Sequence, residues 1–412
     1  MNRLRALVMF WACSSLVAAA TGAHAQTPIP PPPGSQPPAA PKPPIAAPPP
    51  ANPTPAQPAP ARPDAAATQA APQIATAPPI TTREEMEAEF DQFYKVGLDL
   101  ERPLAVHNLK LRRDTMDMTL TDGTVWLAQP IGGRITGAYF HGAGSIKVTI
   151  PNAIDRKLFA QTNGSPSLDV SIDEAVLRFD DATDKELLTA GKPGAAAGSP
   201  NETWVDREHI GYNTTDLQME YLENRLSNLA YASFFVADIH TGKDWLQFRH
   251  RGRQRMEDML LHEEALGAAG KRYYTYLANF HKAQDYDAKG NYDLMPESDA
   301  KDPILERDVT MTVEIPNTKG LTIDARITIE AAREGVRGVR FNFDNNIDAV
   351  YWYETGRPVT TDLVADADGR PLQFLHKCHE LLVILPKPLA KGEKTVVQVK
   401  ATEDTIVQLT DR

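Results

Sequence analysis

The sequence contains only two cysteines, Cys13 and Cys378, among 412 residues. We expect Cys13 to leave with a cleaved leader, so the mature chain would keep one cysteine and form no internal disulfide. The sequence also lacks a His-Glu-x-x-His zinc motif, a Gly-x-Ser-x-Gly motif and any Walker-type or dinucleotide-binding fingerprint. It therefore predicts no cofactor and no metal, and stability that comes from the burial of apolar side chains.

Long cationic runs are absent too, and the formal net charge is −11. This charge argues against nucleic acid and anionic membrane surfaces as partners. The densest cationic stretch runs from Arg249 to Arg255. We interpret it as a solvated turn beside a strand, because such runs more often face solvent than bind phosphate.

Residues 1–25 have the pattern of a secretory signal peptide. A short basic start precedes the apolar run Ala6 to Gly22 and the small-x-small site Ala23-His24-Ala25. The run is short for a membrane span, so we expect cleavage, no stable span afterwards and a periplasmic or secreted protein. A lipid anchor on Cys13 is the alternative, although Phe10-Trp11-Ala12 fits a lipobox poorly.

Residues 26–80 lack aromatic side chains and hold most of the 34 prolines. Such a Pro/Ala-rich segment buries too little apolar surface to offset its ordering entropy, so we expect a disordered linker. In an extended polyproline conformation, at ~3.1 Å per residue, it would reach on the order of 100 Å. We interpret it as a passive exported linker, with a tether as the alternative.

The folded part begins with a capping box, Thr82-Arg83-Glu84-Glu85, which predicts a helix ending near Gly97. Residues 106–150 then alternate between apolar and polar side chains, as strands do. The glycine-containing segments 121–124 and 141–144 predict two hairpin turns in this region. We assign 81–190 to a β-rich domain with an N-terminal helix.

Residues 191–303 predict a mixed α/β region. A helix is expected from Asp216 to Tyr231, because Met219, Leu222, Leu226 and Leu229 form a core-facing stripe. Strand-like pieces follow at 232–237, 245–249 and 273–280.

From Val309 onward the strand pattern persists, with turn signals such as Asp366-Ala367-Asp368-Gly369 between the strands. We expect residues 304–412 to form an antiparallel β-sandwich of roughly seven or eight strands. The predicted fold class is mainly β (α+β): a small β-rich unit with helices, followed by the C-terminal sandwich.

Two stretches resemble a known family. Pro130-Ile131-Gly132-Gly133-Arg134-Ile135-Thr136-Gly137-Ala138-Tyr139-Phe140, with Asp155 to Leu158 and Ala175 to Asp181 after it, is similar to an extra N-terminal region of some bacterial aminopeptidase N-type metallopeptidases. Thr322 to Ile329, with Leu385 to Glu393, is similar to the β-sandwich that precedes the catalytic domain in that family. The resemblance implies a relative of the family's non-catalytic N-terminal region.

The zinc site of that family has no counterpart among these residues. The family uses His-Glu-x-x-His on one helix with a downstream Glu, whereas His262-Glu263-Glu264-Ala265-Leu266 and His379-Glu380-Leu381-Leu382-Val383 both lack the second His. The catalytic activity is therefore not carried over, and we predict no catalytic residue. His376-Lys377-Cys378-His379 is the one cluster of soft ligands, and we interpret it as an edge strand rather than a metal site.

The run Tyr351-Trp352-Tyr353 supplies the candidate binding surface. In a strand, Tyr351 and Tyr353 share one face, where they would stack on a peptide or a sugar. Packing in the core is the simpler interpretation, since aromatic residues favour strands for packing reasons alone.

Together these patterns predict an exported, non-catalytic protein that acts by binding a protein or peptide partner. Two alternatives stay open. The chain is then either the N-terminal piece of a split or truncated zinc metallopeptidase, or a carbohydrate- or cell-wall-binding module on a proline-rich stalk.

Overall fold

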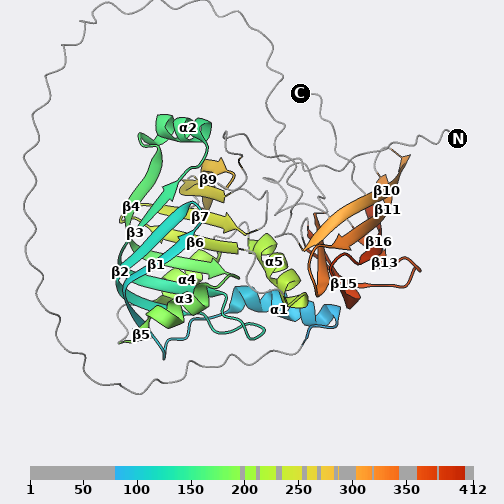
Figure 1. The fold of residues 1–412 in the computed structure, drawn as a ribbon, viewed down its shortest axis with the longest axis horizontal. Coiled ribbons are helices and arrows are strands. Elements are labelled where there is room, and N and C mark those ends of the chain that lie inside the picture. The colour runs from blue at the N-terminus through green and yellow to red at the C-terminus, as the bar shows by residue number, and fades with distance from the viewer. Residues whose placement is uncertain are drawn as a thin grey trace, which may run out of the picture. The chain divides into compact units, whose positions relative to one another are not determined.

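The fold is known from a computed structural model (Figure 1). It describes residues 79–194, 200–209, 214–228, 234–252, 258–266, 271–282, 286, 303–317, 320–342, 360–377 and 380–403. The predicted leader, nearly all of the predicted linker and the run 351–353 lie outside these residues. All described residues belong to one compact unit, Pro72–Arg412.

A nine-stranded antiparallel sheet organises residues 104–280. Its strand order is β5-β1-β2-β3-β4-β6-β7-β8-β9. The predicted mainly β fold is confirmed. The sheet takes strands from both 81–190 and 191–303, while the assignment of separate domains stays a prediction. The strands are β1 (Leu104–Arg113), β2 (Met116–Leu127), β3 (Gly137–Thr149), β4 (Ser167–Phe179), β5 (Lys192–Pro193), β6 (Phe234–His240), β7 (Trp245–Arg251), β8 (Asp258–Leu266) and β9 (Lys271–Phe280).

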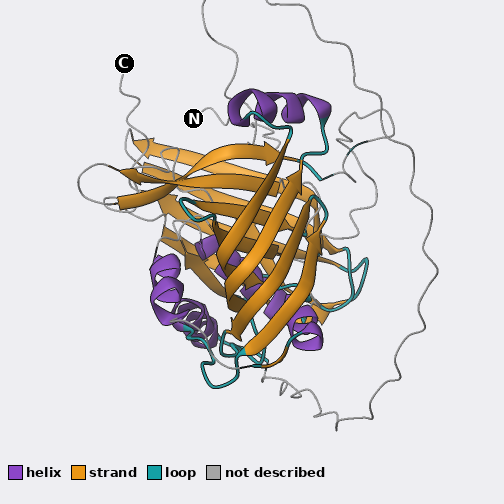
Figure 2. Ribbon diagram, turned by 90° about the vertical axis from the view of Figure 1, so that its left-hand side faces the viewer, coloured by secondary structure: helices purple, strands orange, loops and turns teal. Residues whose placement is uncertain are grey.

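This sheet curls so that its inner face encloses a core of its own. Every strand of this sheet except the two-residue β5 contributes to one cluster of buried apolar side chains, among them Phe140, Leu177 and Phe248. Thr115, in the β1–β2 turn, donates to Asp258 of β8 over 3.0 Å, although four strands separate β2 from β8 in the sheet. Figure 2 shows the strong twist of the strands and a helix across one end of the sheet.

Both hairpin turns expected from glycine are wrong. β2 and β3 each run straight through these segments, and Gly123 pairs with Gly142 across the two strands at irregular points of the ladder. A Cβ on Gly142 would lie 2.5 Å from the Gly123 Cα, so no larger residue fits where the strands approach. The glycines therefore permit a close crossing in a bent strand pair, and the real turn between β1 and β2 lies at Asp114.

The helices begin where the local sequence caps them. The predicted capping box is confirmed, because the Thr82 side chain accepts from the Glu85 backbone N–H and Glu85 caps in return. Asn152 caps the second helix by accepting from the N–H groups of Ile154 and Asp155. The helices are α1 (Arg83–Lys95), α2 (Ala153–Asn163), α3 (Thr183–Ala190), α4 (Pro200–His209) and α5 (Thr214–Leu226).

The outer face of the sheet packs against α1, α4 and α5. Trp126, Tyr139 and Val176 of the sheet join apolar side chains of these helices in a second core. The Trp204 indole of α4 donates to the Val96 carbonyl over 2.9 Å, and the Tyr221 hydroxyl of α5 donates to the Ile131 carbonyl over 2.8 Å. The segment that begins the family resemblance thus supports α5.

The C-terminal part is the expected antiparallel sandwich. Its sheets have the orders β10-β11-β16-β13 and β12-β15-β14, and their facing side chains form a third core. Asp366 Oδ1 accepts from the N–H groups of Asp368 and Arg370, as in a hairpin turn. The strands are β10 (Ile304–Asn317), β11 (Gly320–Ala331), β12 (Val336–Asn342), β13 (Thr360–Ala365), β14 (Gln373–Lys377), β15 (Glu380–Leu389) and β16 (Lys394–Glu403).

The second face of the three-stranded sheet is buried as well. Leu375, Leu382 and Ile384 belong to the same core as α1 and α5. This explains why β15 carries an uninterrupted apolar run at its start rather than an alternating pattern. None of the described helices has the length and apolar character needed to cross a membrane.

Candidate binding surface

The sequence-predicted surface cannot be placed, because Tyr351 and Tyr353 lie outside the described residues. Cys378 and His379 lie outside them too, while His376 and Lys377 end β14 as the edge-strand interpretation expects. Among the residues that the structure describes, no three His, Cys, Asp or Glu side chains are grouped to hold a metal ion.

Most edge strands of the described sheets are protected against pairing with another chain. β5 is two residues long and contains Pro193, which has no N–H to donate. β10 exposes Glu306, Arg307 and Asp308 and has irregular register at two points, as protected edges often have. β13 is short and carries a register shift, and α5 and α1 pack against β12 and β14.

Strand β9, the last strand of the nine-stranded sheet, lacks most of this protection. It is ten residues long and has no charged residue from Tyr273 to Phe280. Tyr276 is 65% exposed. A bulge leaves Leu277 without a partner on β8, so the regular run of β9 covers residues 271–276. We name this run, with the exposed ring of Tyr276, the β9 edge.

A buried polar network holds the β9 edge to the sheet. The Tyr274 hydroxyl donates to Asp238 Oδ1 over 2.5 Å, and Gln247 Nε2 donates to the same oxygen over 2.8 Å. Arg249 Nε donates in turn to Gln247 Oε1. Burial raises the pKa of Asp238 and that of Tyr274, and it lowers the pKa of Arg249. Shifted pKa values also arise in structural networks, and this one fixes the inner tyrosine of β9.

Helix α4 covers the same face of the sheet close to this network. Its Arg207 pairs with Glu263 of β8, and both side chains are nearly buried. The Arg207 guanidinium lies 3.8 Å from the centre of the Trp245 ring, and the His240 ring lies 5.1 Å from it. His240 Nδ1 contacts Asp173 Oδ1 at 2.6 Å. These contacts connect α4 with β7 and with β8, the strand that pairs with β9.

The cationic stretch from Arg249 onward is not the solvated turn that its sequence predicts. Arg249 and Arg251 belong to β7, and Arg249 is buried in the network described above. Arg251 lies 3.9 Å from Glu220, a fully buried carboxylate of α5 that also faces Arg340 at 3.8 Å. Residues 253–257 lie outside the described part. Alternation along β7 turns these arginines toward buried carboxylates, which the charge count alone does not reveal.

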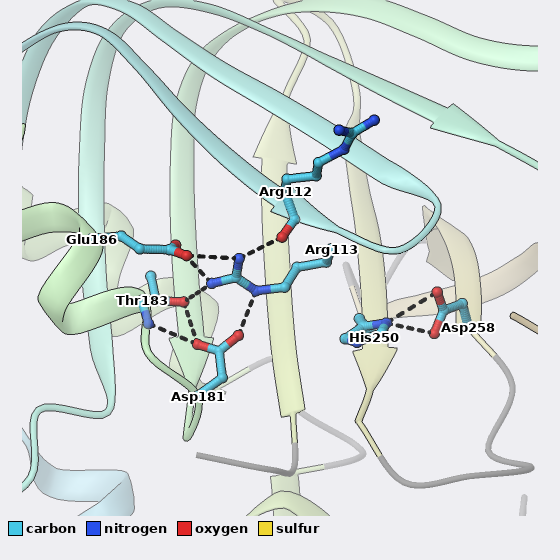
Figure 3. A network of polar contacts seen from close by, with 7 residues as sticks. All are labelled: Arg112, Arg113, Asp181, Thr183, Glu186, His250 and Asp258. Atoms are coloured by element: carbon cyan, nitrogen blue, oxygen red, sulfur yellow. Dashed lines mark hydrogen bonds and ion pairs between the residues drawn. The ribbon is translucent and has the colours of Figure 1, made fainter. Parts of the chain in front are cut away.

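A second polar network closes the curl of the sheet (Figure 3). Arg113, at the end of β1, donates to Asp181 over 2.5 Å and to Glu186 over 2.9 Å, and it contacts Thr183. His250 Nδ1 lies 2.9 Å from Asp258, which also accepts from Thr115. Figure 3 shows two separate sets of contacts, one around Arg113 and one between His250 and Asp258, and within each set the polar groups bind one another. We therefore assign them a structural role.

The β9 edge was visible only in part from the sequence. The sequence predicts a strand at residues 273–280, but it does not predict β8, the strand with which β9 pairs. β8 was not predicted because Glu263 and Glu264 interrupt its apolar pattern. Its signal was the uncharged, tyrosine-rich composition of β9, which favours strands.

Comparison with known proteins gives a weak structural similarity. No family model matches the chain, and no curated protein matches it. A mutant of the M1 zinc metallopeptidase from Deinococcus radiodurans is 12% identical with a TM-score of 0.21, over 26% of this chain and 22% of that chain. The mutant bound to a Tyr-Ser-Ala substrate is 12% identical with a TM-score of 0.21, over 25% and 21%.

The chain therefore spans 22% or less of the length of these two metallopeptidase structures. The similar region covers about a quarter of this chain, 25–26%. It carries no conclusion about activity, substrate or site.

Proposed function

We propose that this chain is an exported β-rich protein that acts by binding a protein or peptide partner, and that the partner adds an extended segment to the β9 edge. The observation that carries the proposal is the contrast between β9 and the other edge strands of the described sheets. β9 is uncharged from Tyr273 to Phe280, and Lys271 and Arg272, the bulge at Leu277 and the contact with α2 are the protections it has. The other described edge strands are short, or charged and irregular, or packed against α1 or α5.

Strand addition suits the chemistry of this edge. The outer strand of a sheet carries a row of backbone N–H and C=O groups that a second strand satisfies, and alternate side chains of the added strand supply specificity. Tyr276 stands beside that row with most of its ring in solvent. Tyr274 is held inward by Asp238. The edge thus combines a fixed backbone with one aromatic contact for the partner.

Two parts of the proposal, export of the chain and its relation to the aminopeptidase N-type enzymes, are supported by the sequence. The leader pattern in residues 1–25 supports export. The stretches 130–140, 322–329 and 385–393 support kinship with the non-catalytic N-terminal region of aminopeptidase N-type enzymes. The proposal is a binding protein without peptidase activity, and equimolar bound zinc with hydrolysis of aminoacyl substrates by the purified protein would contradict it.

The test of binding uses a displayed library of proline-free decapeptides and two exposed substitutions. Tyr276→Lys places a charge on the β9 edge, while Val313→Lys places the same charge on β10, where Val313 is 49% exposed. We expect selected peptides to bind the parent and the Val313→Lys variant alike and to bind the Tyr276→Lys variant at least tenfold more weakly. Each tenfold loss corresponds to about 1.4 kcal/mol.

Hydrogen exchange of the peptide complex supplies a second measurement. Added backbone hydrogen bonds should slow exchange of the amides of residues 271–276. Peptides that bind both lysine variants equally well, or protection that appears only in another segment, would show that the β9 edge is not the binding site.

A further inference from the structure

We infer that the β9 edge binds the β9 edge of a second copy of this chain, so that two nine-stranded sheets join across an antiparallel pair. This inference rests on the proposed function, because it names the partner for the same edge. Two features of β9 favour a second copy as this partner: the distribution of charge along the strand and the face on which its tyrosines lie.

The charges of β9 favour antiparallel self-pairing. Its two charged residues, Lys271 and Arg272, are adjacent at the start of the strand. In an antiparallel pair of two identical strands, they fall at opposite ends of the ladder and face the uncharged end of the partner copy. A parallel pair would instead set the like charges beside each other, which is destabilising. Self-pairing of β9 therefore avoids the repulsion that protects charged edges.

The faces of the sheet restrict the register. Tyr274 and Tyr276 lie on the outer face, while Thr275 between them points to the other face. Directly opposite residues in an antiparallel pair share a face, so a two-fold axis perpendicular to the sheet can pass through Thr275. Thr275 then lies opposite Thr275 of the second copy, and each Tyr276 lies opposite Tyr274 of the other chain. The exposed ring gains an aromatic neighbour, a pairing that stabilises sheets.

The contact surface predicts a weak dimer. The regular run before the Leu277 bulge is short, and α2 packs against β9. Stable dimers generally bury on the order of 1,200 Å² or more, which a single short strand pair does not reach. We expect an equilibrium between monomer and dimer that shifts with protein concentration.

Sedimentation equilibrium over a hundredfold range of concentration tests the association. The parent and the Val313→Lys variant should dimerise alike, and the Tyr276→Lys variant should need at least tenfold more protein, since each dimer then carries two new lysines at the contact. A dimer that ignores Tyr276→Lys would overturn the inference. So would a parent that stays monomeric throughout.

Cysteine cross-linking tests the register. In a chain with Cys378→Ser, Thr275→Cys should form a disulfide-linked dimer under mild oxidation, because opposite Cβ atoms lie about 4.5–5.5 Å apart and small shifts bring them within disulfide reach. Asn279→Cys, an exposed position on the same strand, is the control and should stay unlinked. Equal cross-linking of both variants would exclude the proposed register.

The measurements distinguish failure of the self-pairing inference from failure of the proposed peptide binding. A monomeric parent that still binds library peptides at β9 would end the self-pairing inference and leave the proposed function standing. A monomeric parent that binds no peptide would end both.

Discussion

At the scale of single residues, Asp238 is a buried carboxylate whose surroundings shift its pKa. It lies on β6 beneath the outer face, and both of its hydrogen bonds, from Tyr274 and from Gln247, reach the same oxygen, Oδ1. Burial raises its pKa above the ordinary 3.8, despite the positive charge of Arg207 and Arg249 nearby. The folded protein therefore holds this proton more tightly than the unfolded chain does.

This shift has a definite sign in the dependence of stability on pH. The contribution of Asp238 is fully present below its unfolded pKa, near 3.8, and is lost as pH rises through the higher folded pKa. In Asp238→Asn the amide oxygen accepts both hydrogen bonds without ionising. We expect the parent to lose stability relative to this variant as pH rises above 3.8, by about 1.4 kcal/mol per unit of pKa shift.

Urea unfolding at a series of pH values measures this difference. Asp122→Asn, the same substitution at an exposed position of β2, serves as the control for the exchange of a carboxyl group for an amide. A constant difference between the parent and Asp238→Asn across the whole series would contradict the assignment.

At the scale of elements, paired glycines bend β2 and β3. Gly142 has φ +150°, outside the range that side chains readily adopt, and it faces Gly123 across the ladder. Its position leaves no room for a Cβ, since the nearest atoms belong to the backbone and not to flexible side chains. Long strands that bend at this point allow one sheet to curl around its own core.

We expect Gly142→Ala to destabilise the protein by about 3 kcal/mol or more, because backbone strain and a steric clash add. Gly369→Ala is the matched control. Gly369 also has a positive φ, +79°, but no atom lies within 4 Å of its added Cβ. Its cost should be about 1 kcal/mol, from the backbone conformation alone. Chemical denaturation of both variants separates the clash from the conformational cost, and equal losses would show that the close crossing is unimportant.

At the scale of the whole molecule, the curled sheet is closed by the Arg113 network in Figure 3. Arg113 of β1 binds Asp181 and Glu186, which follow β4, and its guanidinium lies 5.0 Å from the centre of the Phe235 ring of β6. Negative neighbours raise the pKa of Arg113 against the effect of burial. One side chain thus links segments that are distant in the sequence.

We expect Arg113→Met to cost about 3–5 kcal/mol, because it leaves partly buried carboxylates without their cation. The adjacent Arg112 gives the control. Its ion pair with Asp117 is exposed to solvent, so Arg112→Met should cost no more than about 1 kcal/mol. Urea denaturation compares the two variants directly. A similar loss in both would show that the network does not hold the curl closed.

Local signals were sufficient where the relevant partners are close in the sequence. The capping box at Thr82, the buried stripe of Met219, Leu222 and Leu226 in α5 and the strand alternation of the sandwich all depend on neighbours within a few residues. The end of the helix was predicted less well, since α5 ends at Leu226 and not at Tyr231. The glycines at 123 and 142 led to the wrong prediction of two hairpin turns, because a turn and a close approach of two strands both favour glycine. The candidate surface at Tyr351 and Tyr353 stays a prediction.

Periodicity and helix caps act locally, and they are enough to predict a chain rich in strands, a capped helix at the start of the folded part and a sandwich toward the C-terminal side. Which strand ends the large sheet, how that sheet closes and which arginines are buried follow from the tertiary structure. Those outcomes depend on contacts between distant segments, such as Thr115 with Asp258, which no local pattern encodes.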